Sequence, residues 1–273
     1  MLLIDAHAHI YDCYDLNEFL NAASSNFNSV ANQFGCKDNY LGTLLLSETS
    51  KDNWFSRLSE YAKGNTCNTI KEKGSWNFYR TNESISLYAK SDNSKSILLI
   101  AGQQVLTAEG LEVLALATTD RYENGISIGK LIKYIGENNG IPVLPWGVGK
   151  WFGNRGKIIT SLIKNCDTAF FFLGDNSGRP FFWRQPRQFK LARAVGIKIL
   201  PGSDPLPFPS QQTRTGRFGS IVKGSIEKME PARILRRLLF DKKTIVQPYG
   251  KLENFPWFLV NQLRMQCRKK SKI

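Results

Sequence analysis

The chain of 273 residues contains only two histidines, five scattered cysteines and no long apolar run. No apolar stretch approaches the roughly 20 residues that span a bilayer, and polar side chains follow Met1 too closely for a signal peptide. The cysteines are odd in number and form no C-x-x-C motif, which argues against a disulfide framework and against a thiolate zinc site. They are Cys13, Cys36, Cys67, Cys166 and Cys267. These absences favour a soluble, cytoplasmic protein without a membrane partner.

The composition favours one large domain. Apolar residues make up 42% of the chain, which is enough for a substantial core and excludes a disordered chain. Barrels of alternating strands and helices commonly run about 200 to 250 residues as one unit. Because neither an internal repeat nor a low-complexity linker divides the sequence, we expect a single domain over residues 1–273, with a solvated basic tail at about 267–273.

The formal net charge of +14 permits three kinds of partner, which are nucleic acid, a small anionic substrate and an acidic protein. Much of the excess lies in the second half of the chain, between Lys150 and Arg237. No zinc-finger, homeodomain or RNA-recognition signature accompanies these charges. The sequence therefore predicts an anionic small molecule as substrate and allows only non-specific attraction to nucleic acid.

Both histidines lie at the end of the apolar segment that opens the chain, one residue apart. Alternate side chains of an extended segment share a face, so Asp5, His7 and His9 are expected on one side. Two neutral imidazoles on one face can bind a divalent ion, and Asp5 is placed to accept a ring N–H from one of them. Taken alone, the H-x-H pair fits a strand end without a metal about equally well.

Apolar periodicity predicts helices and strands that alternate along the chain. The expected helices are Asp15–Phe34, Trp54–Ala62 (closed by Gly64), Ile126–Asn138, Ile158–Lys164 and Pro186–Val195. The expected strands are Tyr40–Leu46, Trp76–Tyr79, Ile85–Tyr88, Ser96–Ala101, Leu111–Ala117, Ile141–Leu144, Ala169–Leu173 and Ile197–Leu200. The order from Ile126 onward favours a parallel sheet or a barrel. In such barrels the chemistry takes place at the strand C-termini, where the H-x-H pair would lie.

Asp204 directly follows the last of these strands, in the turn Gly202-Ser203-Asp204-Pro205. A carboxylate in this place is suited to be a third metal ligand or a base acting on metal-bound water. The alternative is an Asx turn or a helix cap before Pro205. Two other glycine-containing turns, at 147–149 and 174–178, are expected at the same mouth, where glycine most often serves only the turn.

Three stretches together carry a resemblance: Asp5-Ala6-His7-Ala8-His9, the segment 100–114 around Gln104, and Gly202-Ser203-Asp204. They resemble the PHP (polymerase and histidinol phosphatase) family of metal-dependent phosphoesterases. The wider amidohydrolase group, including the TatD-like hydrolases, shares the opening H-x-H and a late aspartate, and the middle stretch favours the PHP family. The resemblance runs from the first strand to about Asp204. It implies an α/β fold, a distorted (β/α)7-8 TIM-like barrel, with His7, His9 and Asp204 as metal ligands.

The chain departs from the family pattern at three ligand positions. The bridging glutamate of the family falls on Gln104, and two of its histidines fall on Trp146 and Leu206. A full cluster of two or three metals therefore cannot form. The resemblance implies at most one divalent ion, Zn²⁺, Mn²⁺ or Fe²⁺, with Asp204 or Glu112 as the catalytic base.

The residues beside the expected mouth suggest how a substrate is held. Trp146 and Trp151 offer flat apolar surfaces suited to a sugar or a base. Phosphate or carboxylate contacts are expected from basic side chains, for each of which ordinary solvated charge is the alternative. They are Lys150, Arg179, Arg214 and Arg217.

Three functions follow from these observations. The first is a metal-dependent hydrolase, a phosphoesterase acting on a small anionic substrate. The second is a catalytically silent PHP-like barrel that binds a phosphorylated or sugar-containing ligand or a protein partner, as the substitutions at Gln104, Trp146 and Leu206 suggest. The third is non-specific nucleic-acid binding, which would weaken steeply with added salt. The H-x-H pair and Asp204 favour the hydrolase.

Overall fold

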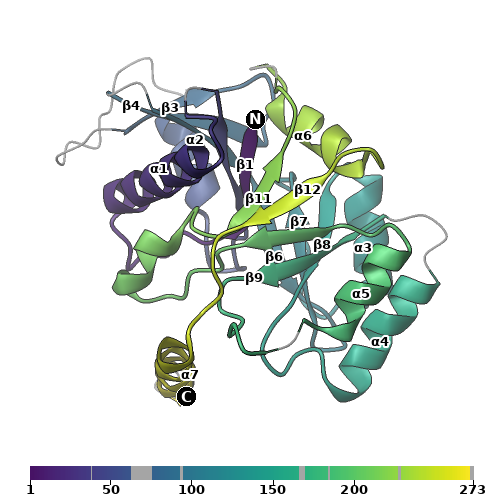
Figure 1. Cartoon of the computed structure of the whole chain (residues 1–273). Helices are drawn as coiled ribbons and strands as arrows, with labels where there is room; N and C mark the ends of the chain where they lie inside the picture. The colour runs from purple at the N-terminus through teal and green to yellow at the C-terminus, as the bar shows by residue number, and fades with distance from the viewer. Residues whose placement is uncertain are drawn as a thin grey trace.

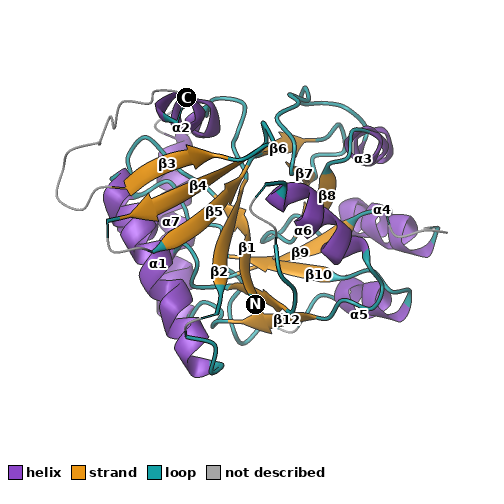
Figure 2. Ribbon diagram, turned by 90° about the horizontal axis from the view of Figure 1, so that it is seen from above, coloured by secondary structure: helices purple, strands orange, loops and turns teal. Residues whose placement is uncertain are grey.

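A computed structural model describes residues 1–37, 39–62, 76–92, 95–165, 170–183, 185–226 and 229–270. These residues form a mixed α/β structure with two sheets and flanking helices (Figure 1). Seen from above, the strands run through the middle of the molecule, with α1 and α2 on one side and α3, α4 and α5 on the other (Figure 2).

The first sheet has seven strands in the order β12-β11-β1-β2-β5-β4-β3. Their bounds are β1 Leu2–Ala8, β2 Leu41–Leu46, β3 Trp76–Arg80, β4 Ser86–Ser91, β5 Ser96–Ile100, β11 Gly219–Val222 and β12 Val246–Tyr249. The strand β1 lies inside this sheet and pairs in parallel with β2 and antiparallel with β11. All seven of its residues are buried, so the chain's opening segment reaches the interior as an almost fully covered strand.

The second sheet has five strands in the order β10-β9-β8-β7-β6. Their bounds are β6 Gly102–Leu106, β7 Glu112–Leu116, β8 Ile141–Pro145, β9 Phe172–Asn176 and β10 Ile199–Gly202. The pairs β8–β9 and β9–β10 are parallel, which confirms the parallel arrangement expected from Ile126 onward. The strands β6 and β7 form an antiparallel hairpin at the other edge.

Seven α-helices and one short 3-10 helix complete the described structure. Their bounds are α1 Leu16–Gln33, α2 Trp54–Tyr61, α3 Ile128–Glu137, α4 Gly153–Lys164, α5 Arg187–Ala194, η1 Pro209–Arg214, α6 Pro231–Phe240 and α7 Phe255–Lys270. The first helix begins at Asp15, whose carboxylate accepts the Glu18 N–H at 2.8 Å as an N-cap. Its apolar side chains recur at helical spacing, and those of Phe19, Leu20 and Phe27 are fully buried.

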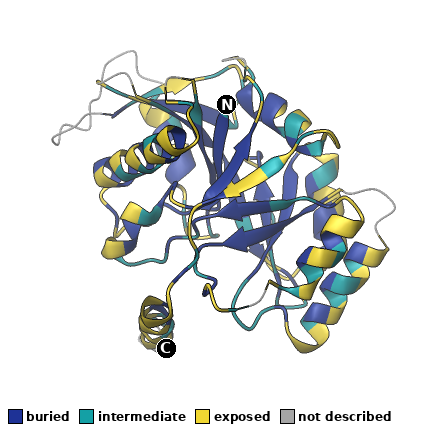
Figure 3. Cartoon of the chain, in the orientation of Figure 1, coloured by how far each residue is buried: buried dark blue, intermediate teal, exposed yellow. Residues whose placement is uncertain are grey.

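The core is arranged in layers around the two sheets. One cluster packs α1 and α2 on the seven-stranded sheet, and another packs α3, α4 and α5 on the five-stranded sheet. A third lies between the sheets and is closed by apolar residues of α6. Buried residues line the interior in Figure 3, whereas α7 is largely exposed. The site described below therefore stands on strands that are fixed by packing on both faces.

The expected closed TIM-like barrel is not confirmed, because the described strands form two separate hydrogen-bonded sheets. The edge of β2 is occupied by β5 over Gly42–Leu45, so β6 meets only the end of β2, through a single bridge between Glu48 and Gln103. On the other side, β1 and β10 approach closely at Gly202, where an added Cβ would lie 2.3 Å from the backbone nitrogen of His7. The two sheets thus meet near the carboxyl ends of β1, β2 and β10.

The other differences from the expected elements concern boundaries and the last quarter of the chain. The strand expected at Ala169–Leu173 is β9, Phe172–Asn176, and both Ala169 and Gly64 lie outside the described residues. The strand β6 and the elements after β10 were not predicted. Much of the expected basic tail is the end of α7, and residues 271–273 lie outside the described part.

Candidate metal centre

The two histidines of the chain lie together at the carboxyl end of β1. His7 is the next-to-last residue of the strand, and His9 follows it by two positions. Their Nε2 atoms are 3.0 Å apart, and both side chains are almost fully buried. The prediction that alternate side chains share one face is confirmed for this pair.

Asp204 comes from the other sheet, just after β10, and reaches both imidazoles. Its Oδ1 lies 3.5 Å from His7 Nε2 and 3.6 Å from His9 Nε2. The backbone N–H of Asp204 donates to the His7 carbonyl at 2.8 Å, so the turn is fixed directly to β1. Its φ of +44° is unusual for a residue with a side chain and is held by this contact. The structure therefore brings His7, His9 and Asp204 to one point.

Gln104 closes a further side of this group. It lies on β6, and its Oε1 is 3.2 Å from His7 Nε2. The position comes from the sheet contact, since the Gln104 N–H donates to the Glu48 carbonyl at the end of β2. An amide oxygen is a neutral ligand and holds a cation more weakly than the carboxylate that the PHP family has in this place.

The donor set fits one divalent ion. Metal–nitrogen bonds of about 2.0 to 2.1 Å in tetrahedral geometry place two ligand atoms about 3.3 Å apart. The three separations between His7, His9 and Asp204 are 3.0, 3.5 and 3.6 Å. Two imidazoles and one carboxylate are also ligands that Zn²⁺ and Fe²⁺ accept. Among the described residues, this is the group of three such side chains whose ligand atoms converge.

The electrostatics keep His9 neutral and able to bind a cation. Burial, together with repulsion from His7, lowers the pKa of His9 to about 3, although the Asp204 charge acts in the opposite direction. An imidazole that stays unprotonated at neutral pH needs to release no proton to become a ligand. Its Nδ1 is buried without a hydrogen-bond partner among the described residues. Its ring instead lies 5.2 Å from the Tyr11 ring in a nearly parallel stack.

Asp5 does not orient a histidine ring, so this expectation is wrong. Its Oδ1 accepts the backbone N–H groups of His7 at 3.2 Å and Ser203 at 2.8 Å. Its Oδ2 accepts the Ser203 hydroxyl at 2.5 Å and the Gly216 N–H at 2.8 Å. Burial raises the pKa of Asp5 to about 6, against these hydrogen bonds, which favour the charged form. Asp5 is therefore a clamp that fixes β1 to the turn carrying Asp204.

The residues expected to hold a substrate are mostly engaged inside the protein. Arg179 is buried and forms two 2.8 Å hydrogen bonds with Asp175. Arg214 pairs with Glu253 and also donates to the Ser177 hydroxyl at 3.2 Å. The basic side chains at these two positions are thus neutralised by partners, which the sequence alone gave no way to see.

Lys150 and Trp146 lie nearer to the centre. The charge of Lys150 is felt at His9, and its ammonium pairs with Glu112, the residue expected as an alternative base. Trp146 is 4% exposed, so its ring presents little surface to a ligand as it stands. Trp151 is buried against Phe189 and donates to the Pro145 carbonyl, and its ring belongs to the core.

Two residues of the site were missed by sequence reasoning. The Asn176 amide donates to Asp204 Oδ2 at 2.9 Å and to the Trp146 carbonyl at 3.0 Å, which orients the aspartate. The segment 174–178 that carries it was interpreted only as a turn, and its place at the end of a strand was the available signal. Tyr11 stacks on His9, and burial together with the Asp204 charge raises the pKa of Tyr11 well above its ordinary value.

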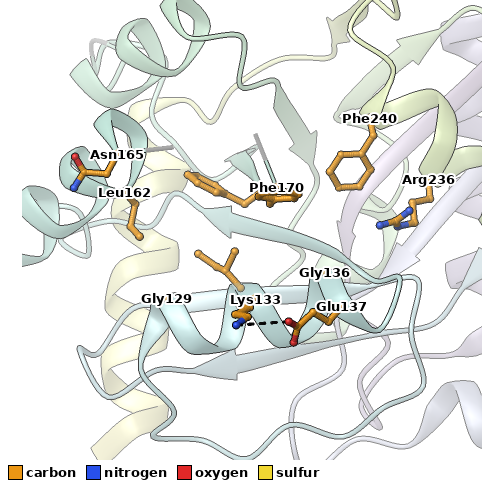
Figure 4. Close-up of a pocket in the computed structure, with 11 residues that line it drawn as sticks. Gly129, Lys133, Gly136, Glu137, Leu162, Asn165, Phe170, Arg236 and Phe240 are labelled. Atoms are coloured by element: carbon orange, nitrogen blue, oxygen red, sulfur yellow. Dashed lines mark ion pairs between the residues drawn. The ribbon is translucent and has the colours of Figure 1, made fainter. Parts of the chain in front are cut away.

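An apolar cavity of about 640 Å³ lies elsewhere, between α3, α4 and α6 (Figure 4). Phe170 and Phe240 face it, and an ion pair between Lys133 and Glu137 lies at its edge. None of the three converging side chains lines it. The candidate metal centre is therefore distinguished by its chemistry rather than by the size of a cavity.

No protein-family model matches the chain, and no curated protein matches it in sequence. Among solved structures, PsfC from Pseudomonas syringae PB-5123 aligns with a TM-score of 0.53 and 12% identity over 97% of this chain and 98% of that chain. The lesion-specific endonuclease PfuEndoQ from Pyrococcus furiosus aligns with a TM-score of 0.53 and 11% identity. That alignment covers 90% of this chain and 58% of the endonuclease, so the chain spans little more than half of that enzyme.

The comparisons correct the expected partner, and the helices of the structure bear on the expected absence of a membrane span. The expected partner, a small anionic substrate, is wrong, because the similarly folded Pyrococcus protein is an endonuclease and acts on nucleic acid. In the described part of the chain, no helix combines the length and apolar character that a bilayer span requires. What the comparisons show is the fold, a mixed α/β structure like that of these two proteins.

Proposed function

We propose that this protein is a metal-dependent hydrolase that cleaves phosphodiester bonds of nucleic acid at the group formed by His7, His9 and Asp204. The observation that carries the proposal is the convergence of these three side chains from two sheets onto one point. A fold shared with an endonuclease and a net charge of +14 support a polyanionic substrate.

The chain's own residues have separate tasks in this proposal. His7 and His9 supply neutral nitrogen ligands, and Asp204 supplies the one negative charge of the set. Asn176 fixes the second oxygen of Asp204, which leaves Oδ1 directed at the imidazoles. A divalent ion bound there would act as a Lewis acid and lower the pKa of a water molecule to near 7. Lys150, whose charge lowers the pKa of His9, could attract a phosphate only by exchanging its ion pair with Glu112 for it.

The test combines metal analysis with a cleavage assay. We expect the purified protein to contain close to one equivalent of Zn²⁺, Mn²⁺ or Fe²⁺ and to cleave single-stranded and duplex oligonucleotides, with and without an abasic site. Asp204→Asn should remove both the metal and the cleavage, whereas Asp241→Asn, on an exposed turn after α6, should leave both unchanged. A metal-free protein that stays inactive after addition of each ion would contradict the proposal.

A second function, nucleic-acid binding without cleavage, is favoured by one observation. Gln104 is neutral where the PHP family has a carboxylate, so among the described residues the site has a single negative charge for a cation. Gln104→Glu distinguishes the two functions. If the protein is a hydrolase limited by weak metal binding, this variant should bind metal more tightly and cleave faster. If the protein only binds, the variant should gain metal affinity without activity.

A further inference from the structure

Seven aromatic side chains form two groups of contacting rings, which are joined along the chain through Phe182 and Trp183 and begin beside the candidate metal centre. We call this set the aromatic strip: Trp146, Phe152, Phe181, Phe182, Trp183, Phe255 and Phe258. The Trp183 ring lies 6.1 Å from Trp146 and 5.9 Å from Phe152, with the second pair nearly parallel at 22°. The strip comes from the segment after β8, the segment after β9 and the start of α7.

The inner end of the strip is one side chain away from a candidate metal ligand. The Asn176 amide donates both to the Trp146 carbonyl and to Asp204 Oδ2. In Figure 1 the amino terminus lies at the top and α7, which begins at Phe255, lies at the bottom. The strip therefore begins close to the candidate metal centre.

The outer part of the strip is exposed. Phe152 is 57% exposed, Phe181 65%, Phe182 51% and Phe255 51%. Large contiguous apolar surface on a protein marks a binding site more often than not. Phe152 stacks on Trp183 and is still more than half exposed. The strip therefore has the geometry of a stacking platform.

The charge of the surrounding chain selects the partner. The segments 141–165, 176–203 and 254–273, which carry the strip, contain 15 lysines and arginines and no aspartate or glutamate. Asp175, Asp204 and Glu253 lie directly at their ends, and Arg179 is paired with Asp175. The whole chain has 37 basic and 23 acidic residues, so the remainder of the chain is close to neutral. Nearly all of the excess charge thus lies in the sequence segments that contain the exposed rings. A partner that combines many negative charges with flat rings is a nucleic-acid strand.

We propose that the aromatic strip binds unpaired nucleotides, whose bases stack on Phe152, Phe182 and Phe255 while basic side chains hold the phosphates. This rests on the proposed function for the direction of the strand, which would lead a phosphodiester bond to His7 and Asp204. Bases inside a duplex are already stacked on one another and cannot lie on the rings. The strip therefore selects single strands, or duplex regions with bases turned out of the helix.

The test measures binding without cleavage, in EDTA, with a fluorescent single-stranded oligothymidine of about 16 nucleotides. Phe152→Ala and Phe182→Ala should each weaken binding about 5-fold or more, since stacking contributes this much per base. Phe152→Trp should retain the affinity. The matched control is Phe170→Ala, because Phe170 is 62% exposed but lies at the apolar cavity of Figure 4. The control should bind as the unchanged protein does.

Two results would overturn the inference. One is equal affinity of the Phe152→Ala, Phe182→Ala and control variants for the single strand. The other is tight binding of the protein to vesicles of phosphatidylserine and phosphatidylcholine, if Phe152→Ala and Phe182→Ala abolish it and leave oligothymidine binding unaffected. That result would assign the strip to a lipid surface. The metal plays no part in this assay. If the strip variants lose affinity and the protein cleaves nothing, the inference stands and the proposed hydrolase is refuted. If the protein cleaves and the strip variants bind and cleave as it does, the hydrolase stands and the inference is refuted.

Discussion

The metal centre and the aromatic strip are neighbours joined by Asn176, yet they are built in opposite ways. His7, His9 and Asp5 are buried, and each is fixed by strands or by hydrogen bonds that cross from one sheet to the other. The rings of Phe152 and Phe182 are half exposed and contact other rings. A reacting phosphate needs groups held within fractions of an ångström, whereas stacked bases tolerate variation. Substitutions in the two regions should therefore have separable effects.

The largest expected effect comes from His7→Ala. Loss of one ligand should remove the metal and reduce cleavage by at least about 10³-fold, because water without a metal has a pKa of about 15.7 instead of about 7. The affinity for oligothymidine in EDTA should change less than about 2-fold, because His7 does not belong to the strip. Metal analysis, cleavage rates and fluorescence anisotropy on the same preparation check this. A parallel loss of single-strand binding would show that the two regions are not separable.

The second effect is on stability and belongs to the buried region alone. Asp5→Ala leaves the N–H groups of Ser203 and Gly216 buried without their acceptor, so the free energy of unfolding should fall by about 3 kcal/mol. Urea unfolding followed by circular dichroism measures this. The matched control, Asp12→Ala, removes an exposed pairing with Arg57 and should cost less than about 0.5 kcal/mol. Similar losses in both variants would show that the Asp5 clamp is unimportant.

The buried region was also the one that the sequence described best. His7 and His9 lie two residues apart at the end of one apolar segment, and Asp204 comes shortly after another apolar strand, so local patterns sufficed to place all three at strand ends. Their convergence depends on the contact of β1 with β10, which the resemblance to a family implied and periodicity alone did not. The role of Asp5 was misjudged, because the partners of its carboxylate, Ser203 and Gly216, are about 200 residues away in the sequence.

The exposed region could not be predicted in the same way. Phe181, Phe182 and Trp183 follow a strand whose boundary was misplaced, and α7 lies beyond the last predicted element. Nothing in the spacing of aromatic residues distinguishes a core from a surface strip, since both use the same side chains. The charge pattern was read as a property of the second half of the chain, whereas the structure shows Arg179 and Arg214 paired with Asp175 and Glu253.

The third effect tests the residue that joins the two regions. Asn176→Ala removes the hydrogen bond that orients Asp204, so metal affinity should fall about 10- to 100-fold, as for other partners that position a ligand. Competition with a chromophoric chelator measures the affinity. Asn165→Ala, at the end of α4, is the control and should not change it. If Asn176→Ala weakens oligothymidine binding as strongly as metal binding, the strip and the centre act as one unit.

The smallest effect is expected from Arg264→Gln. This arginine lies on α7, 4.5 Å above the ring of Phe208 in the loop that follows Asp204, and it has no acidic partner among the described residues. Each phosphate contact contributes close to one unit to the slope of log affinity against log salt, so the slope for oligothymidine should fall by about 1 or less. Lys130→Gln, which removes an exposed charge over Tyr134 on α3, should leave the slope unchanged. Equal slopes in all three proteins would place the phosphates away from α7. Phe152→Ala should also weaken oligothymidine binding by the same factor in the Arg264→Gln background as in the unchanged protein. Together with a reduced slope, this would show that rings and charges of the strip contribute independently.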